Sequence, residues 1–140
     1  MTSITKLLYF KTVLGPENIT LCQYTTHQFT YPTSINPTLN YFLEANNLSL
    51  SLQTKQAKKL LKIRKLVPIF INDDITLFPL NPQRAPIQYY INANSINGIK
   101  SNGLKTMIYF EYGTYIVVNV PYTFVHKKWQ ESLTLSHLLT

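Results

Sequence analysis

Apolar and polar residues alternate in short runs over the first third of the chain, a pattern typical of β-strands. Residues 7–14, 19–24 and 28–31 form three such runs, separated by turn residues of which Gly15-Pro16 is the clearest break. The Pro- and Asn-rich stretch 31–47 predicts a connector that holds one short helix, from Pro37 to Ala45. Residues 47–53, NLSLSLQ, alternate again and predict a half-buried strand.

The periodicity changes to that of a helix at Thr54, which we expect to act as the N-cap. At 100° per residue the lysines of this segment fall on one side, and Ala57, Leu60 and Leu61 fall on the other. Pro68 ends any continuation of the helix. The pattern therefore predicts an internal amphipathic helix with a basic outer face, carrying Lys55, Lys58, Lys59 and Lys62.

The second half of the chain is again rich in strand patterns. Residues 65–71 and 75–80 are apolar runs around the turn Asn72-Asp73-Asp74, and residues 85–92 and 95–100 follow. Residues 104–120 predict a hairpin folded near Tyr112-Gly113. Val125, Trp129, Leu133 and Leu135 lie at nearly helical spacing and predict a C-terminal helix. The fold class is α+β: one β-rich domain, residues 1–140, with antiparallel strands, one internal basic helix and a C-terminal helix.

Charge narrows the range of partners. Thirteen Lys and Arg residues against six Asp and Glu residues give a net charge of +7, although only 14% of the chain is charged. So few charges with so large an excess predict at least one positive region on the surface. Nucleic acid, anionic lipid or an acidic protein are the usual partners of such a region, and a merely solvated basic surface is the alternative.

Localisation follows from what the sequence lacks. The single cysteine, Cys22, forbids an intramolecular disulfide and offers no metal-site spacing. The N-terminal residues do not have the pattern of a signal peptide, and no apolar run is long enough to span a bilayer. We therefore expect a cytoplasmic protein with no metal, no cofactor and no membrane contact.

Candidates for catalysis are few. Asp73-Asp74 is the only adjacent pair of carboxylates, and its position in a turn explains it. A Cys22–His27 nucleophilic pair is conceivable for a small hydrolase, but side chains five residues apart on one strand face opposite ways. No glycine-rich phosphate loop exists. We expect the protein not to be an enzyme and to have no catalytic residues.

The basic segment is the stronger candidate site. Six of the eleven residues from 55 to 65 are Lys or Arg, and none has an acidic residue three or four positions away. A cluster of cations of this kind is suited to contact the phosphates of DNA. Such contacts would give an affinity for DNA that falls steeply as the salt concentration rises. Arg84, between Pro82 and Pro86, is a candidate for entry into a narrow A·T-rich minor groove. Lys127-Lys128 would extend the surface if the C-terminal helix lies near it. The predicted DNA-binding residues are Lys55, Lys58, Lys59, Lys62, Arg64, Lys65 and Arg84.

From Ser51 onward the order and spacing of motifs resemble the competence transcription factor (ComK) family. The stretches that carry the resemblance are SLQTKQA, VPIFI, ITLFPL, APIQYYINANSI and VPYTFVHKKW. It implies a transcription activator of competence genes that binds double-stranded DNA at A/T-rich boxes, mainly through the minor groove, as an oligomer that helps RNA polymerase. Two departures are Thr54-Lys55, where the family has Gly-Arg, and Glu131, where an arginine is usual in the last helix. The family's C-terminal tail, with its adaptor-binding segment, has no counterpart before Thr140, which puts adaptor-mediated proteolysis in doubt.

Two functions remain from these observations. The first is a DNA-binding transcription regulator, favoured by the unpaired lysines and the ordered motifs. The second is a divergent paralogue that acts by protein–protein interaction, forming mixed oligomers that modulate a full-length competence factor. Glu131 and the shorter C-terminus favour the second function.

Overall fold

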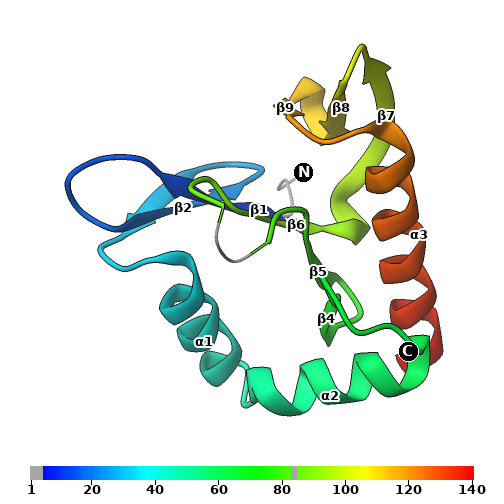
Figure 1. The fold of residues 1–140 in the computed structure, drawn as a ribbon. Helices are drawn as coiled ribbons and strands as arrows, with labels where there is room; N and C mark the ends of the chain where they lie inside the picture. Colours follow the sequence, from blue (N-terminus) through cyan, green and yellow to red (C-terminus); the bar gives the residue numbers. More distant parts are fainter. Residues whose placement is uncertain (1–4, 83–84) are drawn as a thin grey trace.

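A six-stranded antiparallel sheet forms the centre of the molecule (Figure 1). The protein is described by a computed structural model that covers residues 5–82 and 85–140. The strand order is β3 (Gln28–Tyr31), β2 (Ile19–Tyr24), β1 (Leu7–Val13), β6 (Tyr89–Asn92), β5 (Ile75–Pro79) and β4 (Ile69–Asn72). The three N-terminal strands are those that the alternating pattern predicts, with β1 one residue shorter.

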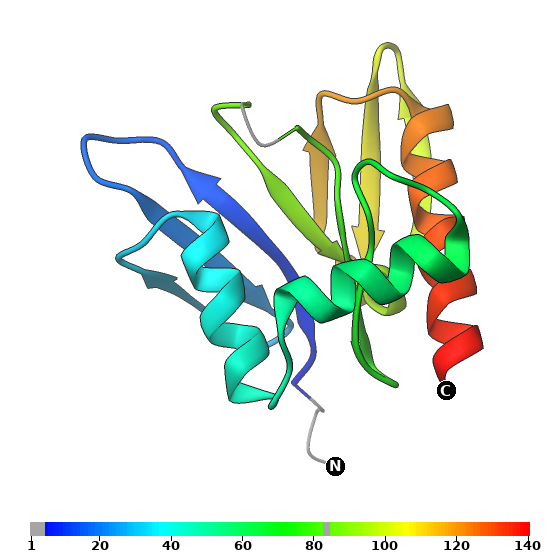
Figure 2. The ribbon, with the colours of Figure 1, turned by 60° about the horizontal axis from the view of Figure 1, so that its bottom comes forward.

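Helices α1 (Ile35–Ala45) and α2 (Leu50–Leu61) cover one face of this sheet, and both lie in front of it in Figure 2. Their apolar side chains pack with residues from the facing side of the strands, including Phe10, Leu77 and Tyr90. Burial of these side chains is the main force that holds α1 on the sheet. The short helix predicted from Pro37 to Ala45 is therefore confirmed, starting two residues earlier.

The other face of the large sheet packs against a second sheet and against α3. The second sheet is antiparallel, in the order β7 (Ile96–Asn102), β8 (Lys105–Phe110) and β9 (Tyr115–Val118). Helix α3 (Tyr122–Leu139) lies along the edge where the two sheets meet (Figure 1). Phe78 and Ile91 face this second core, whereas their neighbours Leu77 and Tyr90 face α1 and α2. This alternation is what a strand buried on both faces requires.

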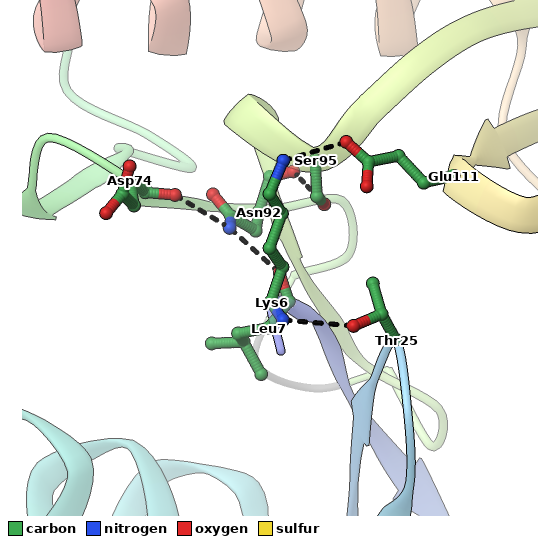
Figure 3. A network of polar contacts seen from close by, with 7 residues as sticks. All are labelled: Lys6, Leu7, Thr25, Asp74, Asn92, Ser95 and Glu111. Carbon is green, nitrogen blue, oxygen red and sulfur yellow. Dashed lines mark hydrogen bonds and ion pairs between the residues drawn. The ribbon is translucent and has the colours of Figure 1, made fainter. Parts of the chain in front are cut away.

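Asn92 joins the parts of the molecule at the end of β6 (Figure 3). Its side chain is 1% exposed, and its Nδ2 donates to the carbonyl oxygens of Leu7 and Asp74 at 2.9 and 3.0 Å. Its Oδ1 accepts from the backbone N–H groups of Thr76 and Asn94 at 3.1 and 3.2 Å. One buried amide thus ties β1, β5 and the β4–β5 turn to the one-turn 3₁₀ helix η1 (Ala93–Ser95), which leads into the second sheet.

The expected β-rich α+β class is confirmed, and so is the hairpin of residues 104–120. The hairpin turns through a 3₁₀ segment, η2 (Glu111–Gly113), in which Tyr112 and Gly113 have φ of 63° and 77°. Asp73 and Asp74 form the β4–β5 turn, where the backbone N–H of Asp74 donates to Asn72 Oδ1 at 2.8 Å. The C-terminal helix spans the segment that its apolar spacing predicts.

The predicted strand at 47–53 is wrong, and so is the N-cap at Thr54. Helix α2 begins at Leu50, and its N-cap is Ser49, whose Oγ accepts from the backbone N–H of Leu52 at 3.4 Å. Leu48 and Leu50 lie at the N-terminus of α2 and pack against the core. The alternation of apolar and polar residues in this segment therefore does not correspond to a strand. Leu60, predicted to face inward, is 41% exposed because Ala57 and Leu61 already make the contact with α3.

Candidate nucleic-acid interface

Helix α2 and the loop after it carry a cluster of cations that we call the basic surface. All of its members are exposed: Lys55, Lys58, Lys59, Lys62, Arg64 and Lys65. The helix runs across the front of the sheet between α1 and α3, so its outer side faces solvent (Figure 2). Six of the seven residues that the sequence predicts for DNA contact are therefore brought together on one surface. Arg84, the seventh, lies outside the described residues.

The backbone after α2 turns sharply and brings Arg64 and Lys65 toward the sheet. Lys62 ends the helix in the left-handed conformation, with φ 56° and ψ 41°, and Leu66 also has a positive φ of 50°. Left-handed backbone costs a non-glycine residue roughly 1–2 kcal/mol, so neighbouring contacts must hold it in place. Helix α3 supplies these contacts.

Lys128 of α3 is the residue that holds this loop. The residue is 5% exposed, and its Nζ donates to the carbonyl oxygens of Lys65 at 3.3 Å and Leu66 at 3.1 Å. The same Nζ lies 2.8 Å from Glu131 Oε1, one turn further along the helix. A buried ammonium needs a counter-charge, and Glu131 provides it. Lys128 therefore supports the basic surface from beneath and is not one of its exposed cations, whereas Lys127 is exposed.

Glu131 gains a physical role from this geometry. The sequence suggests a reversal of sign in the last helix, where the resemblance implies an arginine. In the structure the carboxylate neutralises Lys128 and is itself half-buried, so it adds no exposed negative charge next to the basic surface.

No cation of the basic surface is paired within residues 5–82 and 85–140. The ion pairs of this part of the chain are Lys6–Glu111, at 2.8 Å, and Lys128–Glu131. Both lie outside the basic surface. Its positive charges are thus available to an anion, and like charges at i, i+4 spacing cost some stability when none is bound.

Three members of the basic surface, Lys58, Arg64 and Lys65, also line a cavity of about 760 Å³ between α1, α2 and the sheet. Sequence reasoning missed this cavity because its other walls come from α1 and from the segments that flank β5 and β6.

Sequence reasoning also missed the burial of Lys128, although the spacing of residues in the last helix indicates it. Val125, Lys128, Ser132 and Leu135 follow the 3-4-3 spacing of a buried helix stripe, and all four are buried.

The candidates for catalysis do not come together. Cys22 is fully buried in β2, and burial raises the pKa of its thiol to about 12. His27 is exposed in the turn between β2 and β3, where its ring stacks on that of Tyr24 with a centroid distance of 5.0 Å. Across the described residues, no group of three or more metal-ligating side chains gathers, and no helix has both the length and the apolar character needed to cross a membrane.

A family model, the ComK protein family, matches residues 20–140, which is most of the chain. The chain belongs to the ComK family. This is a family of competence-related transcription factors and not of enzymes. The match begins at Thr20 and so extends further toward the N-terminus than the motifs from Ser51 onward. Neither the curated proteins nor the solved structures gave a significant match.

The motifs that carry the resemblance have clear structural roles. Ser51 to Ala57 lie in the first two turns of α2, and Ala57 is fully buried against α3. Phe78, before Pro79 at the end of β5, is fully buried between the sheets. Asn92 is the buried junction of Figure 3. Ala57, Phe78 and Asn92 therefore specify packing, whereas Lys55 is an exposed residue of the basic surface.

Proposed function

We propose that residues 1–140 form one DNA-binding domain of a cytoplasmic transcription regulator that activates competence genes. The observation that carries the proposal is the basic surface: six exposed cations on one helix and its loop, none paired among the described residues. Membership of the ComK family supports the regulatory role. Contact with RNA polymerase at the promoter is part of the proposal.

The target is double-stranded DNA at A/T-rich boxes, read mainly through the minor groove. A·T and T·A pairs look nearly alike there, so recognition depends on groove width and deformability more than on base hydrogen bonds. Point charges on lysine stems suit this mode because they follow the phosphates without reading a base edge. With six cations engaged, log K falls with log salt at a slope of about −5.

The experiment is a titration of fluorescent duplexes, one with A/T-rich boxes and one G·C-rich, followed by anisotropy at several salt concentrations. The Lys58→Ala/Lys59→Ala/Lys62→Ala variant should bind both duplexes more weakly, with a slope reduced by about 3. Equal affinity of the wild-type protein for the two duplexes would contradict recognition of A/T boxes.

A matched control separates a local interface from net charge. Lys100 and Lys105 are exposed on β7 and β8 of the second sheet, away from α2. Changing these two to alanine removes two positive charges and should leave the salt slope close to that of the wild type. If this double variant loses as much affinity as the lysine triple variant of α2, the basic surface is not the interface.

A second function is favoured by a different surface. Strand β9 is an edge of the three-stranded sheet, and it exposes Tyr115 (54%) and Val117 (41%). Across the strands Tyr115 pairs with Tyr109 and Val117 with Met107, so these four side chains lie together on one face of the sheet, beside Lys100. We propose that this face mediates assembly of copies of the chain, and that mixed oligomers with a full-length ComK protein are the alternative mode of action. Co-purification of the two proteins without DNA, together with loss of A/T-box binding by this chain alone, would favour the alternative.

A further inference from the structure

The cavity of about 760 Å³ beneath the basic surface has the size of a small-molecule site, for which 300–1,000 Å³ is usual. Its walls come from α1, α2, the loop after α2, and the segments that flank β5 and β6. Leu50, Ile69 and Tyr90 form part of an apolar lining. Burial raises the pKa of the Tyr90 hydroxyl, so this side chain stays neutral in the physiological pH range.

One side of the cavity is strongly positive. Lys58, Arg64 and Lys65 line it, and none of its described lining residues is acidic. Three cations around one space suit a phosphate group, and the planar guanidinium of Arg64 offers two parallel donors to it. The backbone next to Arg64 is held in place, because Lys128 Nζ donates hydrogen bonds to the carbonyl oxygens of the next two residues, Lys65 and Leu66.

The remaining polar lining consists of four side-chain amides and the hydroxyl of Thr54. Asn36 and Asn40 come from α1, Asn81 follows β5, and Gln88 precedes β6. Amides both donate and accept hydrogen bonds, so they suit the hydroxyl and ring nitrogen atoms of an organic molecule. Inorganic phosphate would use only the positive side and would leave the apolar and amide walls without contact.

We propose that this cavity binds a phosphorylated organic molecule of about mononucleotide size, with its phosphate on Lys58, Arg64 and Lys65. Its organic part lies against the apolar wall and the amides. Since the same three cations belong to the basic surface, the ligand competes with DNA. This consequence rests on the proposed function, whereas the binding itself does not.

Calorimetric titration of the full chain with AMP, UMP and ribose 5-phosphate, each compared with inorganic phosphate, tests the proposal. At least one organic phosphate should bind with one-to-one stoichiometry and at least tenfold more tightly than inorganic phosphate. Loss of the charge-assisted contact in Arg64→Gln should weaken this binding by tenfold or more. If all three organic phosphates bind no more tightly than inorganic phosphate, the proposal is overturned.

Two further variants separate the cavity from general charge. Lys62→Gln removes one charge from the same helix outside the cavity lining, and should change the affinity by less than about twofold. Asn40→Phe keeps every charge and places a ring at an exposed position of the rim, so it should block the ligand while the chain still folds and still binds DNA. Equal losses in Lys62→Gln and Arg64→Gln, or full binding by a folded Asn40→Phe, would overturn the cavity site. Failure of DNA binding alone would overturn the proposed function and leave the cavity site intact.

Discussion

Removing the carboxylate of Glu131 is the sharpest test of how the basic surface is held in place. In Glu131→Ala the ammonium of Lys128 loses its counter-charge, 2.8 Å away, but stays within reach of the carbonyl oxygens of Lys65 and Leu66. The side chain of Lys128 is 6% exposed, so little solvent is available to replace the lost partner. We therefore expect an unpaired, buried positive charge beneath the basic surface.

The size of the effect follows from this burial. Breaking a buried ion pair by deleting one partner costs about 3–5 kcal/mol. The carboxylate of Glu131 retains 16% exposure, so the lower end of that range applies, about 3 kcal/mol. For a chain of 140 residues this corresponds to a fall in Tm of about 10 °C.

Urea unfolding followed by circular dichroism measures the change in free energy of unfolding. Glu44→Ala is the matched control, because Glu44 is exposed on α1, and it should stay within about 0.5 kcal/mol of the wild type. Lys128→Met combined with Glu131→Ala removes the unpaired charge and should be less destabilised than Glu131→Ala alone. Glu131→Ala as stable as Glu44→Ala would refute the reasoning.

Three more outcomes follow from the structure. Asn92→Ala leaves the buried N–H of Thr76, the partly buried N–H of Asn94 and two carbonyls without their side-chain partner, and should lower the free energy of unfolding by about 3 kcal/mol, measured by urea unfolding. Burial raises the pKa of the Cys22 thiol from 9.0 to about 12, so just above pH 9 this thiol ionises in the unfolded chain but not in the folded one. Between pH 8 and 10 the free energy of unfolding of the wild type should therefore fall by about 1 kcal/mol more than that of Cys22→Ala. Tyr115→Ser with Val117→Ser should lower the mass observed by analytical ultracentrifugation if the face of β9 joins copies of the chain, and an unchanged mass would exclude that face.

The strands were predictable because their side chains alternate between two different environments. Residues 19–24 form β2, in which buried Thr20 and Cys22 alternate with less buried neighbours, and they pair with the edge strand at residues 28–31. The start of α2 was not predictable in the same way. The leucines at positions 48, 50 and 52 have the spacing of a strand. In the structure Ser49 caps helix α2, so Leu48 lies before the helix, Leu50 begins it, and Leu52 is exposed on its first turn. Periodicity over so few residues does not distinguish the two structures.

The basic surface was predictable for a similar reason: its cations are close in sequence and on one helix. The cavity was not, because Asn36, Asn81 and Gln88 are far apart along the chain and only the sheet order brings them together. The role of Glu131 was hidden in the same way. The sequence alone indicates only that Glu131 reduces the positive charge near Lys127 and Lys128. The structure shows that it neutralises the buried ammonium of Lys128.

The placement of the acidic residues explains how the basic surface stays unpaired at little cost to the fold. Glu111 and Glu131 pair with Lys6 and Lys128, and Asp73-Asp74 form a turn. The other two acidic residues, Glu17 and Glu44, form no ion pair with any described residue. Repulsion between lysines at i, i+4 costs about 0.2–0.5 kcal/mol per pair. Lysines in the last turn of α2 interact favourably with the helix dipole by a comparable amount. The two effects nearly cancel, so removing these charges should alter anion binding far more than stability, and the loss of binding in the lysine variants can be attributed to the interface itself.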